Sequence, residues 1–282
     1  MATLEELDIA KWAEQPTDDI NKEFREAVHT ILAAISDDEK LRASMVLKGG
    51  ILLAVRYHSH RYTTDIDLST EQKLGEQFSV ESVRDSLNQS LAITIESLDY
   101  NLDCRVQSAK QNPKNSEATH PSINLKVGYA YKGTDKHKRL VSDQGSPTAI
   151  SIDYSLNEAM QDIDQVKLVQ GNELNVYSIT DLIAEKFRSL LQQVPRERFR
   201  RQDVFDLFLI FENFDDFDYV EKHKIHTALL FKSKARGIIP TIDSIDEPEL
   251  KSRAMKDYST LRDEIEGAVS YTHLTLPTTP YV

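Results

Sequence analysis

The stretch from 48 to 69, KGGILLAVRYHSHRYTTDIDLS, constrains the fold most, because it joins a glycine pair to a pair of carboxylates. The alternation of acidic and apolar residues over 65–69 predicts a strand in which Asp65 and Asp67 share one face, opposite a side that faces a core. Like charges this close repel each other, and a cation such as Mg²⁺ is the simplest group that stabilises them. The pair therefore predicts a metal site.

Gly49 and Gly50 lie directly before the apolar segment 51–55, which we expect to form a short helix. Glycine allows the backbone to approach a phosphate closely, and the free amides of a helix N-terminus favour an anion. A Gly-Gly pair alone is more often a turn, and an Asp-x-Asp pair alone is more often a solvated edge. Together and in this order, they predict a phosphate-binding backbone beside a metal site.

These two motifs resemble the first motif of the nucleotidyltransferase superfamily, a glycine pair at a helix start followed by Asp-x-Asp on the next strand. More narrowly, Lys-Gly-Gly at 48–50 and Arg-x-Thr-x-Asp-Ile-Asp at 61–67 resemble the AbiEii/AbiGii-type toxins of abortive-infection and toxin–antitoxin systems. The resemblance implies catalytic roles for Asp65 and Asp67. It also implies a set of nucleotide-binding residues: Lys48, Gly49, Gly50, Arg61 and Thr63.

Composition limits the classes of protein to consider. The 282 residues can form one large domain or two modest ones. A net charge of -12 argues against a generally basic nucleic-acid binder, so any such contact needs a local patch. The single cysteine, Cys104, excludes a disulfide framework and a cysteine-based zinc site, and the histidines have no zinc-ligand spacing.

The N-terminus is acidic, and no segment approaches the roughly 18 apolar residues of a membrane span. We therefore expect a soluble cytoplasmic protein with no membrane partner.

The first part of the chain mixes helices and strands. We expect helices over 21–36 and 79–91, a strand over 93–96, a polar surface loop over 107–120 and a strand over 123–131. The segment 132–139, KGTDKHKR, is a basic turn; a solvated hairpin tip is the simpler interpretation, and a nucleic-acid contact is the alternative.

Asp153 lies in a third alternating segment, between Ile152 and Tyr154. An isolated aspartate on the polar side of a strand ordinarily faces solvent. The nucleotidyltransferase resemblance implies, however, that a third metal-binding carboxylate lies on a strand adjacent to the Asp-x-Asp strand. Asp153 is the best-placed candidate, because the alternative, Asp143, lies in a glycine-containing loop without a strand pattern.

The composition changes to helical near residue 175, after two short strands that begin at Val166. The tail from 269, VSYTHLTLPTTPYV, has no acid, lysine or arginine and resembles a translated sequencing adapter. We therefore expect a nucleotidyltransferase-like domain over 1–175, a helical region over 176–268 that completes the active site, and a non-native tail over 269–282. The native chain is expected to continue beyond about Ala268. The fold class is α+β, with a nucleotidyltransferase-like mixed sheet, flanking helices and a C-terminal helical region.

A second group of charges follows. A helix over 181–193, with Thr180 as N-cap, has Lys186 at the edge of its apolar face, where a lone lysine would extend to solvent. The link RERFRR at 196–201 leads to an apolar helix over 202–211 that includes Asp203 and Asp206. Buried carboxylates need partners, so salt bridges between the two helices are one interpretation.

Glu-Lys at 185–186, the arginine-rich link and Asp-x-x-Asp-Leu at 203–207 are similar to later motifs of the AbiEii/AbiGii-type toxins, with Gln202 as a minor departure. The resemblance implies that Lys186 is catalytic and contacts the nucleotide, and that Asp203 is catalytic. The arginines of the link are candidates for RNA binding: Arg196, Arg198, Arg200 and Arg201.

The resulting hypothesis is a nucleotidyltransferase toxin that depends on Mg²⁺, held by Asp65, Asp67 and Asp153. The family resemblance implies transfer of nucleotides from an NTP to an acceptor, in several members the 3′ end of tRNA, and a cognate antitoxin encoded nearby. The alternatives are transfer to a small molecule or a protein, and a non-catalytic NTP-binding module.

Overall fold

The computed structural model describes residues 4–15, 18–61, 63–75, 78–114, 118–142, 144–169, 171–214, 216–256 and 258–264. Asp143 and the expected non-native tail lie outside these ranges. The chain forms two compact, interleaved units. Unit 1 comprises Met1–His58, Thr64–Glu158 and Asp164–Val176, and unit 2 comprises Ser59–Thr63, Ala159–Ile163 and Tyr177–Val282.

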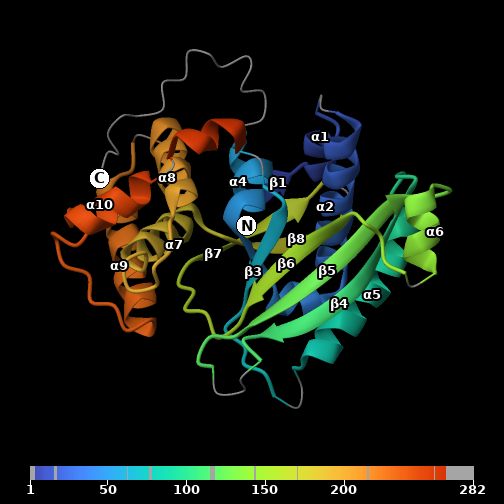
Figure 1. Ribbon diagram of the computed structural model, residues 1–282, viewed down its shortest axis with the longest axis horizontal. Helices are drawn as coiled ribbons and strands as arrows, with labels where there is room; N and C mark the ends of the chain where they lie inside the picture. Colours follow the sequence, from blue (N-terminus) through green and yellow to red (C-terminus); the bar gives the residue numbers. More distant parts are fainter. Residues whose placement is uncertain are drawn as a thin grey trace. The chain divides into compact units, whose positions relative to one another are not determined.

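An eight-stranded mixed sheet, counted over the described residues, organises unit 1 (Figure 1). Its strand order is β1-β7-β8-β2-β3-β6-β5-β4. The strands β1, β2 and β3 pair in parallel with β7, β8 and β6, whereas the pairs β2–β3, β5–β6 and β4–β5 are antiparallel. The bounds are β1 Glu5–Leu7, β2 Val46–Lys48, β3 Asp65–Ser69, β4 Leu102–Asn112, β5 Ser122–Tyr131, β6 Ala149–Ser155, β7 Ile163–Leu168 and β8 Glu173–Tyr177.

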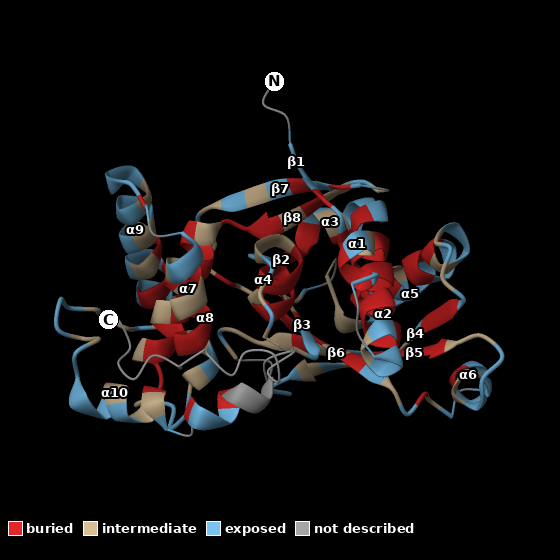
Figure 2. Cartoon of the chain, turned by 90° about the horizontal axis from the view of Figure 1, so that it is seen from above, coloured by how far each residue is buried: buried red, intermediate tan, exposed pale blue. Residues whose placement is uncertain are grey.

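Helices flank this sheet, which confirms the expected fold class. The longest, α2, begins after Asp18, whose side chain accepts a hydrogen bond from the Asn21 amide at 2.8 Å. It packs against α5 and the strands β4, β5 and β6, and Figure 2 shows it buried along most of its length. The bounds are α1 Ile9–Ala13, α2 Asp19–Asp37, α3 Glu39–Ser44, α4 Gly49–Tyr57, α5 Val80–Ser97 and α6 Asp135–Val141.

The strand expected over 93–96 is wrong, because α5 continues to Ser97. Leu87, Leu91 and Thr94 follow helical spacing and are all buried, so one face of this segment packs in the core as a helix. The Thr94 hydroxyl donates to the Ser90 carbonyl at 3.0 Å, one turn earlier. Burial of a helical face therefore outweighs the local preference of the β-branched residues for a strand.

The polar loop expected from Gln107 begins only after Asn112. The segment 108–112 is the second half of β4 and pairs with β5 from Ser108↔Lys126 to Asn112↔Ser122. The register shifts between Val106 and Ser108, which marks a β-bulge there. Polar residues can form this strand because pairing with β5 provides hydrogen bonds to their backbone groups, whatever side chains they carry.

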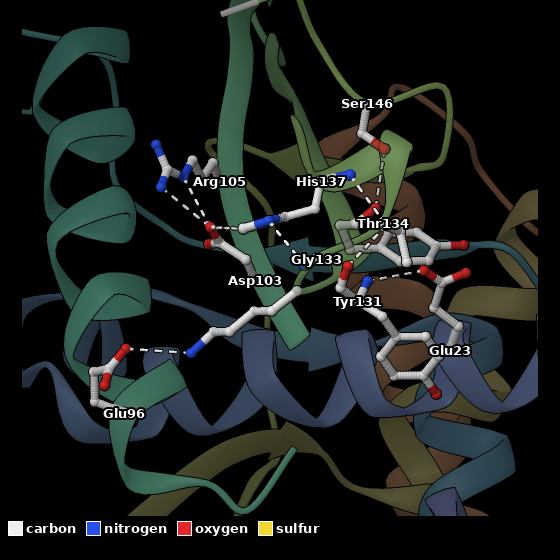
Figure 3. A network of polar contacts seen from close by, with 11 residues as sticks. Glu23, Glu96, Asp103, Arg105, Tyr131, Gly133, Thr134, His137 and Ser146 are labelled. Carbon is white, nitrogen blue, oxygen red and sulfur yellow. Dashed lines mark hydrogen bonds and ion pairs between the residues drawn. The ribbon is translucent and has the colours of Figure 1, made fainter. Parts of the chain in front are cut away.

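The basic segment 132–139 is not a solvated hairpin tip, because most of it lies in α6. Lys136 Nζ lies 3.0 Å from the carboxylate of Glu23, which is buried. His137 Nε2 lies 3.1 Å from Oδ2 of buried Asp103, which also accepts from Arg105, as Figure 3 shows. Two of the basic side chains therefore serve internal contacts, which weakens the alternative of a nucleic-acid surface.

The described residues of unit 2 that follow Tyr177 are mainly helical. The bounds are α7 Ile179–Leu191, α8 Arg201–Asn213, α9 Tyr219–Ala235, α10 Pro248–Met255 and the 3₁₀ helix η1 Tyr258–Glu264. Ser178, rather than Thr180, is the N-cap of α7, and its hydroxyl accepts from the Asp181 amide at 3.1 Å. None of the described helices combines the length and apolar character needed to span a membrane.

A buried lysine holds α9 to α7. Lys232, which is 2% exposed, forms an ion pair with Asp181 at 2.7 Å and donates to the Ala159 carbonyl at 3.0 Å. Its ammonium also lies 4.4 Å from the ring centroid of Tyr177. Burial raises the pKa of Asp181, although the positive charge of Lys232 acts to lower it. This part of the chain contains no motif that the sequence alone reveals.

Candidate active site

The three candidate metal-binding carboxylates lie on two neighbouring strands of unit 1. In the parallel pair β3–β6, Asp67 is the register partner of Asp153. Neighbouring strands are about 4.8 Å apart, and Asp65 precedes Asp67 on the same face by about 6.6 Å. Ile66 and Ile152 point to the buried side. The predicted strand over 65–69 and its adjacency to the strand of Asp153 are therefore confirmed.

The carboxylate oxygens do not meet at one point. Among the residues that the structure describes, no group of three or more His, Cys, Asp or Glu side chains could hold a metal ion as oriented. Asp153 instead accepts a hydrogen bond from Asn124 Nδ2 at 3.2 Å, and Asp65 lies 3.4 Å from the Thr64 hydroxyl. The donor set, carboxylates only, suits Mg²⁺ chemically. The metal site thus stays a prediction supported by strand register rather than by side-chain convergence.

Gly49 packs directly against the Asp67 carboxylate. It begins α4 with φ of +72°, a left-handed conformation that favours glycine, and a Cβ built there would overlap the Asp67 side chain. Its neighbour Lys48, the last residue of β2, is the antiparallel register partner of Asp67. The absence of a side chain at 49 therefore brings the start of α4 against the acidic face of β3.

Lys48 and Gly50 complete the first motif in unit 1. Both residues are buried, and Lys48 Nζ lies 3.4 Å from the Ser155 hydroxyl on β6. The N-cap position of α4 provides no side-chain hydrogen bond to the first-turn amides. Such amides can bind an anion, as the sequence analysis expects of this helix start.

The other predicted site residues, Arg61, Thr63, Lys186, Asp203 and the arginines of the link, belong to unit 2. Thr63 is half-buried. Tyr62 lies outside the described ranges.

Lys186 lies at the centre of an ion network and is 6% exposed, which excludes the alternative of a lone lysine that extends to solvent. Its Nζ donates to Asp206 Oδ2 at 2.6 Å and to Asp203 Oδ1 at 3.2 Å. Asp206, which is 1% exposed, also accepts from Arg61 Nε at 2.7 Å and from Arg61 Nη2 at 3.1 Å. The expected salt bridges between the two helices are therefore present, and Asp206 is the partner that two cations share.

The network keeps Lys186 and Asp206 charged. Burial alone would lower the pKa of Lys186, but the carboxylates of Asp206 and Asp203 outweigh burial and raise it. Burial alone would raise the pKa of Asp206, but Lys186 and Arg61 outweigh burial and lower it. Lys186 is therefore a buried permanent cation, a group that can stabilise negative charge developing on a phosphate. Asp206 was not among the predicted site residues, although its spacing of three from Asp203 places both carboxylates on one flank of the helix.

The arginine-rich link concentrates positive charge between α7 and α8. Arg196 and Arg198 are exposed, and Arg200 Nη1 lies 3.8 Å from Asp203. Burial and the neighbouring positive charges, Arg236 foremost among them, lower the pKa of Arg196. Arg201 starts α8 and is half-buried.

Among solved structures, the chain is similar to JHP933 from Helicobacter pylori, with 14% identity, coverage of 88% of this chain and 96% of that chain, and a TM-score of 0.45. It is also similar to the MenT4 nucleotidyltransferase toxin from Mycobacterium tuberculosis, with 13% identity, coverage of 93% and 91%, and a TM-score of 0.43. No curated protein sequence matches it.

The family model described as the nucleotidyl transferase AbiEii toxin of type IV toxin–antitoxin systems matches residues 30–274, which is most of the chain. This span includes the glycine pair, the Asp-x-Asp strand, Lys186 and the Asp-x-x-Asp helix. The chain therefore belongs to the AbiEii family and is a nucleotidyltransferase toxin of a type IV toxin–antitoxin system.

Proposed function

We propose that this toxin transfers nucleotides from an NTP to the 3′ end of a tRNA in a reaction that depends on Mg²⁺. Family membership implies the NTP substrate and an antitoxin partner. The proposal adds three points to this: a requirement for Mg²⁺, a tRNA acceptor, and a location in the cytoplasm, where both NTPs and tRNA are found. The observation that supports it most is the register of Asp67 beside Asp153, with Gly49 packed on Asp67.

In unit 1, Asp65, Asp67 and Asp153 are the proposed metal-binding residues, since carboxylates on one face of adjacent strands suit an oxygen-coordinated cation. Mg²⁺, when bound, would neutralise phosphate charge and activate the attacking hydroxyl. The glycines at the start of α4 allow a phosphate to approach the backbone amides. We assign Lys48, Gly49 and Gly50 to the terminal phosphates of the nucleotide.

In unit 2, Lys186 is proposed to neutralise charge that develops on the phosphates, and Asp203 to orient the Lys186 ammonium, which it contacts at 3.2 Å. Arg61 and Thr63 are proposed to contact the nucleotide. Phosphoryl transfer depends mainly on positioning and charge stabilisation, which these residue types can supply without a covalent intermediate. The arginine-rich link is the proposed contact for RNA on an otherwise acidic protein, through the side chains of Arg196, Arg198, Arg200 and Arg201.

The test compares Asp153→Asn with Asn124→Ala. The first change removes a proposed metal-binding charge, whereas the second removes the 3.2 Å hydrogen bond to Asp153 and keeps the carboxylate. With labelled NTP, tRNA and a titration of Mg²⁺, Asp153→Asn should lower the transfer rate about 100-fold or more and require more metal. Asn124→Ala should stay within about tenfold of the unchanged protein.

Transfer that persists at full rate in EDTA would contradict the metal requirement. Label that accumulates on a small molecule or on protein, and never on RNA, would contradict the tRNA acceptor. Nucleotide binding without any product would favour the non-catalytic NTP-binding module instead.

A further inference from the structure

Unit 2 presents one aromatic ring to solvent in the middle of the arginine-rich link. Phe199 is 43% exposed and lies between two arginines in the sequence. Lys256 Nζ lies 4.4 Å from its ring centroid, and the Arg253 guanidinium carbon lies 5.9 Å from it. Both cations come from α10 or the residue that ends it, far from the link in the sequence. The fold thus adds two cations to the link that the local sequence does not reveal.

The charge around this ring is mainly positive. Arg196 and Arg198 are exposed in the same link, and Arg200 is partly exposed. Acids offset part of this charge: Glu197 lies in the link, Glu249 pairs with Arg253 at 3.0 Å, and Asp203 lies 3.8 Å from Arg200. Five cations against these three acids still leave a positive balance. On a chain with a net charge of -12, such a local positive cluster is complementary to a polyanion.

An exposed phenylalanine in a polar link contributes little to a core. Phe187 and Phe211, by contrast, pack within unit 2 with ring centroids 6.4 Å apart. Phe231 on α9 is comparably exposed, at 46%, but over the described residues no cation lies above its ring. The combination of exposure and surrounding cations therefore distinguishes Phe199.

We propose that Phe199 is a stacking platform for a base of single-stranded RNA, with Arg198, Arg253 and Lys256 contacting the flanking phosphates. Aromatic rings bind bases of any sequence, because every base has a π face, and basic side chains follow the backbone. The long side chains of Lys256 and Arg253 can move from the ring to a phosphate, because an exposed cation–π contact is weaker than a base stack. This inference rests on the proposed function and specifies how the RNA acceptor is held.

The test measures binding of a fluorescein-labelled, unstructured 12-nucleotide RNA by anisotropy, in EDTA and without NTP. The length is chosen to be about the site size of small single-strand binding modules. Phe199→Leu, which keeps an apolar side chain and removes the ring, should weaken binding by about 5-fold to 100-fold. Phe199→Trp should restore it. The matched control Phe231→Leu should bind as the unchanged protein does.

Lys256→Gln should lower the slope of log K against log salt by about 0.7, the effect of one lost phosphate contact on a single strand. Equal affinities for Phe199→Leu and the unchanged protein would overturn the stacking role. A duplex RNA that binds as tightly as the single strand, or no measurable RNA binding, would overturn the platform.

The assay also separates this inference from the proposed function, because it needs neither metal nor nucleotide. Transfer activity on another acceptor with no RNA binding would reject the platform and the tRNA acceptor together. RNA binding that depends on Phe199, in a protein without transfer activity, would retain the platform and reject the proposed catalysis.

Discussion

Replacement of Asp206 by asparagine tests the ion network of unit 2 most directly. Asn keeps the shape of the side chain and removes the negative charge that faces Lys186 at 2.6 Å and Arg61 at 2.7 Å. Removal of one partner from a buried ion pair costs about 3–5 kcal/mol, because the remaining charges stay buried without compensation. Asp203, 3.2 Å from Lys186, retains part of the compensation. We therefore expect a loss of about 3 kcal/mol in the free energy of unfolding.

For a unit of the size of unit 2, this loss corresponds to a fall in melting temperature of about 10–15 °C. Far-UV circular dichroism should follow the melting, because unit 2 is largely helical. The single tryptophan, Trp12, lies in unit 1, so its fluorescence reports on that unit. Asp135→Asn, at a side chain that is 94% exposed, is the control and should change stability by less than about 0.5 kcal/mol.

A double-mutant cycle with Lys186→Met isolates the contact. Removing both charges should cost less than the sum of the two single changes, with a coupling free energy of about 1–3 kcal/mol. The contribution of Asp206 should be present above pH 3.8, its unfolded pKa, and be lost as the pH falls through its lowered folded pKa. A loss below about 1 kcal/mol for Asp206→Asn, or strict additivity in the cycle, would refute the reasoning.

Two further predictions concern unit 1. Gly49→Ala should abolish transfer in the labelled-NTP assay, because its Cβ would displace the Asp67 carboxylate. Gly133 also has a positive φ, but no atom lies within 4 Å of a Cβ built there, so the control Gly133→Ala should remain active. Equal activities of the two variants would contradict the role of the contact between Gly49 and Asp67. Stability should also fall between pH 6.5 and about 4, because burial lowers the folded pKa of His29 to about 4 and only the unfolded chain binds the proton in this range. In urea denaturation, His29→Gln should reduce this fall by about 2–3 kcal/mol, and an unchanged pH dependence would argue against it.

The local parts of the site could be predicted because their signals are local. The alternation at 65–69 and the glycine pair before an apolar segment each identify an element within a few residues. The strand pattern around Asp153 was also readable, and its place beside Asp67 followed from the nucleotidyltransferase resemblance.

The rest depended on contacts between distant residues. The polar half of β4 is a strand because β5 pairs with it, and the segment 93–96 is helical because Thr94 completes a buried face. Lys186 is buried because Asp206 and Asp203 lie on another helix and Arg61 arrives from a segment far earlier in the chain. Neither the secondary-structure propensity of a residue nor the hydrophobic periodicity of a segment reveals such distant partners.

The interleaving of the two units has a practical consequence for dissecting this toxin. A fragment cut at 177 would lack Arg61, one of the two cations that Asp206 binds, and Ala159, whose carbonyl accepts from Lys232. It would also lack Asp162, whose backbone carbonyl accepts a hydrogen bond from the Ser178 amide at the start of α7. The fragment 177–282 expressed alone should therefore fold poorly, unless the N-terminal fragment or short peptides covering 59–63 and 159–163 are supplied with it.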